Sequence, residues 1–433
     1  MKLHTKIFIG LLAGGLSGLA VNWWASSPAW VERVKWFDTN VAGPLGQIFL
    51  RLLLMTVVPL VFTSITLGVA QLGDIRKVGR IGVRSLAYFF LSTLISAVIG
   101  IVLVNLVRPG VGVPQDVRQQ LLDAYRGQVS GPPAGSHAFG VDFFVKIVPA
   151  NPIQAAANLD MLGIIFFALI FGAALTLVPD ERARPLVRVL EAIGDAIAKI
   201  IGLAMHLAPY GVFGLIFVVT SLLGWDIVRK LLTYVLVVLA GLLIHGAVSL
   251  SLLVRVLGGL NPLVFWRRIT ASIITAFTTS SSNATLPTNI TVAEEELKIP
   301  PKIAGFVLSL GSTLCHNGTA LYEGVTVLFL AQLFGVNLTL GQQVIAIVLS
   351  VMTAAGTAGV PGGSLAPLMI VCVAVGIPPE VVGVVYGVER ILDMSRTTLN
   401  VCGDLTAAVY VARAEGGWDP RLVTAQAGLA PAA

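Results

Sequence analysis

Long apolar runs recur along the whole sequence, and no other feature limits its fold as strongly. A helix needs roughly 20 apolar residues to cross a bilayer. Hydrophobic residues make up 56% of the chain and charged residues 12%, about half the share usual in soluble domains. This pattern predicts an all-α polytopic membrane protein and excludes a soluble enzyme. The runs that are long enough lie near residues 7–26, 43–70, 82–107, 142–178, 186–223, 227–256, 300–334 and 380–412.

Basic residues collect in every second connection between these runs, beginning with Lys2 and Lys6. Such connections face the cytoplasm, which predicts eight crossings of the inner (plasma) membrane with both termini inside the cell. The net charge of +6 comes from short basic clusters suited to anionic lipid, so nucleic acid is not expected as a partner. In the first run Gly10, Gly14 and Gly18 recur every four residues, which allows another helix to approach closely.

Two further segments, 269–293 and 344–376, are apolar at both ends but rich in Ser, Thr, Asn, Gly or Pro in the middle. Non-helical backbone at membrane depth is tolerated only where protein or a water-filled cavity supplies hydrogen bonds. The segments therefore predict two re-entrant helical hairpins, at about 261–294 and 342–376. Basic residues flank only the first, so the hairpins enter from opposite sides, as in inverted repeats with the substrate site at their interface.

The last run carries Asp393, Arg396, Thr397, Asn400 and Asp404 on one helical face. Each charge at mid-bilayer costs about 2.5–3.5 kcal/mol, so this stripe indicates a function rather than a salt-bridge network that only joins helices. The guanidinium suits a carboxylate and the first aspartate suits an ammonium, which fits a zwitterion with a second carboxylate. Asp404 either holds a monovalent cation or serves as an internal counter-charge.

Four motifs, TTSSSNATLPT, GTALYEGV, GTAGVPGG and RILDMSRTTLNVCGDL, occur in this order. Together they resemble the dicarboxylate/amino acid:cation symporters, the glutamate and aspartate transporter family. The resemblance implies a homotrimer with a fixed scaffold and a transport domain that moves like an elevator. It implies scaffold helices 1 and 2 in 1–70, transport-domain helix 3 in 78–108, an extracellular loop at 109–140, scaffold helices 4 and 5 in 141–223, the rest of the transport domain in 226–415 and a cytoplasmic tail at 416–433.

The resemblance also implies the substrate site. In the family the aspartate at position 393 binds the amino group of the substrate, and the arginine at 396 binds its side-chain carboxylate; Arg390 is a supporting charge. The substrate ligands implied are Ser281 and Ser282 at the first hairpin tip, Thr319 in the unwound seventh helix, Val360 and Gly362 at the second hairpin tip, and Asp393, Arg396, Thr397 and Asn400 in the eighth helix.

The chain departs from the family at its deep sodium site. Where the family has Asn-Met-Asp-Gly-Thr, this chain has Cys-His-Asn-Gly-Thr at 315–319, and Phe89 replaces a tyrosine. These changes remove hard oxygen ligands and a negative charge, so we expect this site to be lost. A second sodium site, around Gly311, Asn400 and Asp404, relies mostly on backbone carbonyls and remains possible.

Two ionisable groups can replace the lost cation. Glu323 matches the glutamate implicated in proton carriage in animal glutamate transporters, and a low-dielectric helix bundle favours a neutral carboxyl. His316 titrates near neutral pH in water, although a lone membrane histidine is also common as a packing residue.

The sequence therefore predicts a secondary symporter that imports aspartate or glutamate, with proton coupling favoured over obligatory multi-sodium coupling. The alternatives left open are a sodium-coupled symporter of acidic amino acids or C4-dicarboxylates, and a family member that acts mainly as an anion-conducting channel. No enzyme motif is found, and no cofactor is expected; the transported ions are H⁺ and, where the second sodium site is retained, Na⁺. The expected partners are the acidic amino acid, membrane lipids and two further copies of the chain.

Overall fold

A computed structural model of the protein describes residues 3–24, 28–71, 75–113, 148–158, 161–355, 357, 362–416 and 418–425. Over these residues the regular structure is helical, and no strand occurs among them. The all-helical prediction is confirmed for this part of the chain. Most of the loop expected at 109–140 and part of the tail expected at 416–433 lie outside it.

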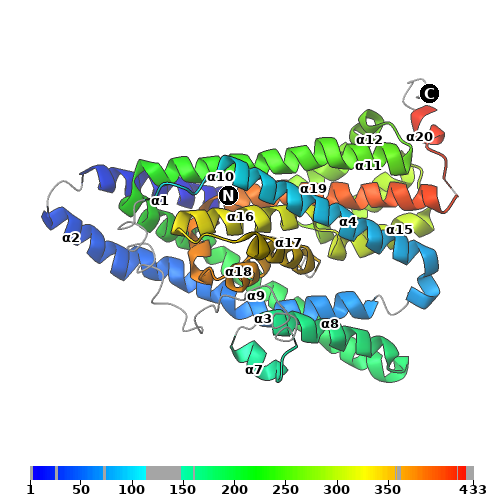
Figure 1. Cartoon of the computed structure of the whole chain (residues 1–433), viewed down its shortest axis with the longest axis horizontal. Helices are drawn as coiled ribbons and strands as arrows, with labels where there is room; N and C mark the ends of the chain where they lie inside the picture. The colour runs from blue at the N-terminus through cyan, green and yellow to red at the C-terminus, as the bar shows by residue number, and fades with distance from the viewer. Residues whose placement is uncertain are drawn as a thin grey trace.

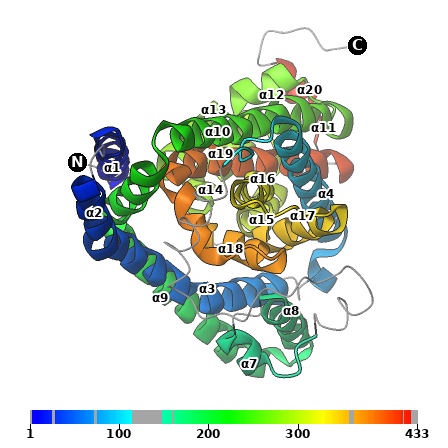
Figure 2. The ribbon, with the colours of Figure 1, turned by 60° about the vertical axis from the view of Figure 1, so that its left-hand side comes forward.

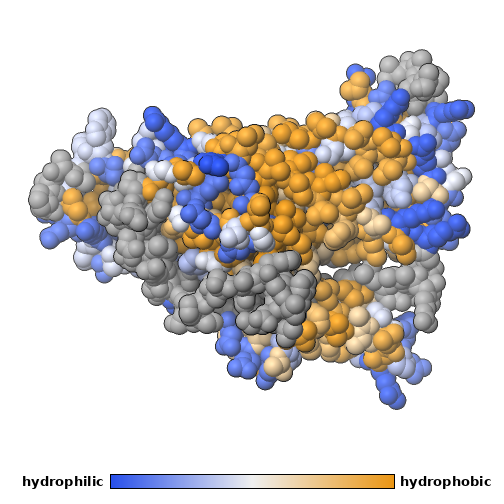
Figure 3. All heavy atoms as spheres, viewed as in Figure 1, coloured by the Kyte–Doolittle hydropathy of each residue, from blue (hydrophilic) through white to orange (hydrophobic). Residues whose placement is uncertain are grey.

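Apolar side chains form a band across the face of the molecule that Figure 3 shows. In Figure 3 hydrophobic side chains cover the middle of the visible face, and hydrophilic ones gather toward its two ends. Among the described residues, four helical segments are long and apolar enough to cross a membrane: Thr5–Trp24, Arg80–Val107, Asp180–Ser221 and Trp225–Gly258. This is the arrangement expected of a protein whose outer surface meets lipid.

One group of helices, which we call the scaffold layer, forms a wall along one side of the molecule (Figure 2). The long α9 packs against α1 and α3, and α3 packs against α8. The run expected at 142–178 is described as two helices, since Asn151 caps a short separate helix before the second one. The scaffold layer consists of α1 (Leu3–Trp24), α3 (Gly43–Gln71), α8 (Met161–Leu177) and α9 (Asp180–Leu223), flanked by α2 (Pro28–Phe37), η1 (Asp38–Ala42) and α7 (Pro152–Ala157).

Glycines bring α1 directly onto the backbone of α9. A Cβ atom at Gly10 or Gly14 would overlap the carbonyl oxygens of Pro209 and Phe213, and one at Gly18 would overlap Thr220. The close helix packing predicted from the glycine spacing is therefore present, and it lies within a single chain.

The remaining helices, which we call the site bundle, surround α16 (Figures 1 and 2). This helix contacts α4, α10, α17, α18 and α19. The bundle consists of α4 (Ile75–Val107), α10 (Trp225–Ile244) with its continuation η3, α11 and η4 to Gly258, α12 (Pro262–Arg268), α13 (Thr270–Thr279), α14 (Ser282–Thr291), η5 (Val292–Glu296), α15 (Pro301–Leu314), α16 (Asn317–Phe334), α17 (Leu340–Ala354), α18 (Leu365–Ala374), η6 (Pro379–Val382) and α19 (Gly383–Ala414); α20 (Arg421–Ala425) follows.

Three segments of the site bundle break in the middle. Helices α13 and α14 pack against each other across Ser280, whose φ of 51° lies in the left-handed region, and Ser281 caps the second helix. Helices α17 and α18 also pack together. Between them in the sequence, α15 and α16 are separated by Cys315 and His316, where the helical hydrogen bonding stops. These breaks free polar groups in the interior, and they position the site.

Candidate functional site

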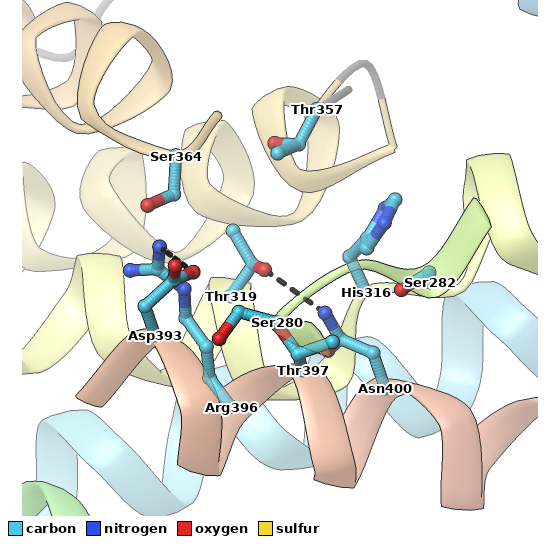
Figure 4. A pocket seen from close by; sticks show the side chains of 10 residues that line it. All are labelled: Ser280, Ser282, His316, Thr319, Thr357, Ser364, Asp393, Arg396, Thr397 and Asn400. Atoms are coloured by element: carbon cyan, nitrogen blue, oxygen red, sulfur yellow. Dashed lines mark hydrogen bonds and ion pairs between the residues drawn. The ribbon is translucent and has the colours of Figure 1, made fainter. Parts of the chain in front are cut away.

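A polar pocket lies where the three breaks face α19. Residues from both helix pairs and from the break before α16 lie over the same face of α19 in Figure 4, where the ring of His316 is directed away from α19. None of the described residues of the scaffold layer lines it. The lining residues are Ser280, Ser282, His316, Thr319, Thr357, Ser364, Asp393, Arg396, Thr397 and Asn400.

Arg396 is the principal charge of the pocket, and its side chain is only 2% exposed. Its Nη2 donates to Asp393 Oδ1 at 2.6 Å and to Glu389 Oε1 at 2.7 Å. The guanidinium also stacks over the ring of Tyr322, 4.5 Å from the centroid. Its Nη1 is buried and has no hydrogen-bond partner in the described part of the chain. One end of the fork is thus held and the other is available to a ligand.

A second arginine completes the charge balance. Arg390 Nη1 lies 3.2 Å from Asp393 Oδ2, and the backbone N–H of Gly362 donates to the same oxygen at 3.3 Å. Two carboxylates, Glu389 and Asp393, therefore face two guanidinium groups. These four groups sum to zero charge when no ligand is bound.

The start of α16 is fastened to α19. The N–H of Gly318 donates to Asn400 Oδ1 at 2.7 Å, and Asn400 Nδ2 donates to Thr319 Oγ1 at 3.2 Å. A Cβ at Gly318 would overlap the backbone of Arg396, so this close approach requires glycine. The contact fixes Thr319 and Asn400 in the pocket wall.

Several polar atoms of the pocket are buried without a partner among the described residues. They are the hydroxyls of Ser280 and Ser364, both ring nitrogens of His316 and Nη1 of Arg396. Buried polar groups in native proteins are nearly always hydrogen-bonded, and each exception needs an explanation. Their convergence on one pocket indicates a polar, anionic ligand.

The structure places most of the predicted substrate residues together. Ser282, His316, Thr319, Asp393, Arg396, Thr397 and Asn400 line the pocket. Gly362 reaches it through its bond to Asp393, whereas Ser281 serves as the cap of α14. Val360 lies outside the described residues.

Four residues of the site were not predicted. Ser280, Thr357 and Ser364 lie in the same polar motifs as predicted neighbours, and only the backbone geometry of each break selects among them. Glu389 precedes Arg396 by seven residues, which is two helical turns, so its spacing was a usable signal.

Glu323 and Asp404 are buried carboxyls beside the pocket. Glu323 Oε2 accepts a hydrogen bond from Thr353 of α17 at 2.7 Å, and its Oε1 has no partner among the described residues. Neither oxygen of Asp404 has a partner there, and Gly311 packs against this carboxylate. A bare buried carboxylate is costly, so each group must hold a proton or lie next to a cation. In the described residues no three His, Cys, Asp or Glu side chains converge, so a cation beside Asp404 would also need other oxygen ligands.

Comparison with known proteins agrees with this geometry. The profile of the sodium:dicarboxylate symporter family matches residues 3–414. The chain is 33% identical to the proton/glutamate-aspartate symporter of Escherichia coli (strain K12) over 419 residues, 96% of this chain and 94% of the relative. It is 33% identical to the proton/sodium-glutamate symport protein of Bacillus subtilis (strain 168), with the same coverage. It is 32% identical to human excitatory amino acid transporter 3, over 83% of this chain and 76% of the relative.

The family predicted from the four sequence motifs is therefore confirmed. The match extends over nearly the entire length of the chain, including the helix breaks and the polar stripe of α19. This protein belongs to the sodium:dicarboxylate symporter family.

Proposed function

We propose that this protein is a secondary symporter that imports aspartate or glutamate together with protons. The observation that carries the proposal is the buried Arg396, which is held through Nη2 and presents an unpartnered Nη1 beside Asp393. The distal carboxylate of the substrate would bind this guanidinium, and its ammonium would bind Asp393. The main-chain carboxylate would take the hydroxyls at the α13–α14 break. The names of the bacterial relatives support this substrate class.

The charge balance of the pocket explains why a cation must travel with the substrate. Glu389 and Asp393 already neutralise Arg390 and Arg396. An acidic amino acid adds one net negative charge, and a buried charge at mid-bilayer costs about 2.5–3.5 kcal/mol. One co-transported proton or sodium ion cancels this charge before the loaded site crosses the membrane.

We assign the proton first to Glu323 and second to His316. Glu323 is completely buried, and its hydrogen bond from Thr353 links it to the α17–α18 pair. A change in the protonation of Glu323 therefore alters a contact with the segment that covers the pocket. His316 lies in the pocket wall with both ring nitrogens unpartnered among the described residues. Sodium is then dispensable, or stimulates modestly through Asp404, Gly311 and Asn400.

The packing supports the expected division into a fixed scaffold and a mobile transport domain. All the pocket residues in the described part of the chain belong to the site bundle, and none of them belongs to the scaffold layer. We propose that three chains associate through the scaffold layers within the lipid of the plasma membrane, with both termini in the cytoplasm. The site bundle then moves as an elevator, and the two helix pairs act as re-entrant gates. Crosslinks between chains should form in the scaffold layer and not in the site bundle.

Uptake into proteoliposomes tests the function directly, with pH and sodium gradients imposed separately. Stereoselective, saturable accumulation of aspartate or glutamate under an inward proton gradient alone is the expected result. Accumulation that requires sodium at constant pH would assign coupling to the Asp404 site. Anion current without accumulation would assign a channel instead.

A further inference from the structure

Three helical segments of the site bundle end close together, and a side chain from another segment caps each end. The last four carbonyl groups of a helix have no partner within that helix. At the end of α19 the carbonyl oxygen of Ala414 accepts a hydrogen bond from Arg84 of α4. At the end of η4 the carbonyl oxygens of Val256 and Leu257 accept from Arg413 of α19, each at 3.4 Å. The ends of α4, α19 and η4 are thus joined by side chains.

The third cap comes from Trp418, which follows α19 and reaches the base of the α13–α14 pair. Its Nε1 donates at 2.7 Å to the carbonyl oxygen of Leu297, which ends η5, the continuation of α14. The indole is only 7% exposed, and Val423 of α20 is completely buried in the same apolar core. Both views place α20 beside α12, the helix that leads into α13 (Figures 1 and 2). The described part of the expected tail is therefore packed against the bundle.

Two glycines fix the place from which this segment leaves α19. A Cβ at Gly258 would overlap Val409 of α19, and one at Gly259 would overlap the guanidinium of Arg413. Gly259 also has a φ of 67°, in the left-handed region that other residues rarely adopt. The end of η4 and the end of α19 therefore approach each other closely, and the chain continues from there to Leu297.

The α13–α14 pair is held differently at its two ends. At the tip, the buried hydroxyl of Ser280 faces the pocket without a partner among the described residues. At the base, Leu297 accepts the hydrogen bond from Trp418, and Arg268 pairs with Glu296 at 2.7 Å. A movement that opens the tip must therefore turn about a base that the segment after α19 holds in place.

We propose that Arg413, Trp418 and Val423, which we call the clasp, hold the α13–α14 pair closed over the pocket and set how readily this gate opens. The gating role rests on the proposed function, in which the pair is one of two gates. Trp418 is a positioning residue, because it does not line the described pocket and acts through Leu297 on α14. The substrate-contacting end of α14 is Ser282, which does line it.

Amide deuterium exchange in the purified full chain tests the clasp without substrate. Trp418→Phe keeps most of the ring and removes the N–H, which leaves the buried carbonyl of Leu297 without its donor. The loss of such a partner shifts a local opening equilibrium by about 5-fold or more. Exchange in residues 282–296 should accelerate by this factor, while α1 and α9 stay unchanged. Trp225→Phe is the matched control, because this indole is 58% exposed at the start of α10.

Unchanged exchange in residues 282–296 of Trp418→Phe would overturn the proposal. An equal rise in α1 and α9 would also overturn it, because it would mean a general loss of stability. If Trp418→Phe does not fold, Val423→Ala, which trims the buried side chain of α20, is measured with the same outcomes.

The gating role has its own readout in proteoliposomes. Trp418→Phe should exchange internal for external aspartate faster than the wild type and than Trp225→Phe. An unchanged rate in a variant with faster deuterium exchange would overturn the gating role. A wild type that does not transport acidic amino acids would disprove the proposed function, while deuterium exchange would still test the clasp.

Discussion

The scaffold layer and the site bundle are built from the same apolar composition but stabilised in different ways. In the scaffold layer α1 touches α9 through glycine and backbone atoms, and among the described residues of this layer and its flanking segments the one buried side-chain polar atom without a partner is Asp38 Oδ1. In the site bundle two guanidinium nitrogens, three carboxylate oxygens and two imidazoles are buried without partners in the described structure. The difference teaches that close helix packing stabilises the scaffold layer, whereas the many buried polar groups of the site bundle need substrate and a cation or proton as partners.

Removing Arg396 should have the largest effect. Arg396→Ala deletes the buried guanidinium that we assign to the distal carboxylate, and loss of one partner of such a desolvated pair costs about 2–5 kcal/mol, at least ~30-fold in affinity. Calorimetric titration with aspartate, glutamate and neutral amino acids measures it. Neutral substrates should be much less affected. Unchanged affinity for acidic substrates would remove Arg396 from the substrate site.

The next largest effect concerns proton coupling. Glu323→Gln keeps the size of the side chain but cannot release a proton, so uptake should no longer accelerate under an inward proton gradient, while exchange of internal for external substrate continues. Thr353→Val is the matched control: it removes the hydrogen bond to Glu323 and keeps the carboxyl. If the glutamine variant still responds to the pH gradient like the wild type, another group carries the proton, and His316→Gln becomes the next variant to measure.

Asp404 should have a smaller effect on uptake. Its carboxylate oxygens are unpartnered in the described structure, and we assign to it only the residual sodium stimulation. Asp404→Asn should therefore abolish that stimulation and leave proton-driven uptake little changed. Initial rates in sodium and in choline at one pH measure both quantities. Loss of all uptake in choline would mean that sodium is obligatory and that the site bundle needs this cation to function.

On the scaffold side the expected effect is on stability and not on coupling. Gly14→Ala forces α1 away from the carbonyl of Phe213, and such overpacking costs about 1–3 kcal/mol. Gly15→Ala is the control, because its Cβ would lie 3.7 Å from Ile216, an ordinary contact. Thermal unfolding in detergent should show a lower Tm for the first variant only. Equal stability of both variants would mean that α1 is not held on α9 as described.

The smallest effect concerns Asp38, an acidic side chain of the scaffold side that precedes the apolar run of α3. Partial burial raises the pKa of this carboxyl from 3.8 to about 6, although the hydrogen bond from Ser221 lowers it. The folded protein binds the proton more tightly, so this contribution to stability is present below pH 4 and is lost as the pH rises through 6. Asp38→Asn should flatten the difference in Tm between pH 4.5 and pH 7. An identical pH profile for wild type and variant would contradict it.

Much of this arrangement was predictable from the sequence because membrane insertion imposes strong patterns. The long apolar runs gave the helices, and the polar middles gave the breaks before α14 and between α17 and α18. The charges of α19 identified Asp393 and Arg396. The seven-residue spacing puts Glu389 on the same helical face as Arg396, but the sharing of one guanidinium nitrogen by Glu389 and Asp393 depends on the rotamer of Arg396 and on its stacking over Tyr322.

The sequence also could not show that the side-chain amide of Asn317 is hydrogen-bonded through both its oxygen and its nitrogen. Its replacement of an aspartate indicated a lost ligand, but whether the amide would be left unpaired depended on two hydroxyls more than two hundred residues away in α4. Contacts of such separation are set by how α4 and α16 pack. They follow from the folded bundle and not from local pattern.

The charges on α19 have a consequence for the assembly of the protein in the cell. Glu389 and Asp393 pair with Arg390 and Arg396 within the helix, but Asn400 and Asp404 face neighbouring helices, and each buried charge left unpaired costs about 2.5–3.5 kcal/mol, so α19 is costly to insert into lipid as an independent unit. The chain order answers the difficulty, because α13–α18, which supply its polar neighbours, are synthesised first. We expect the end of the chain to integrate as a group. The translocation machinery should hold α13–α18 until α19 arrives and should not release each helix separately to lipid.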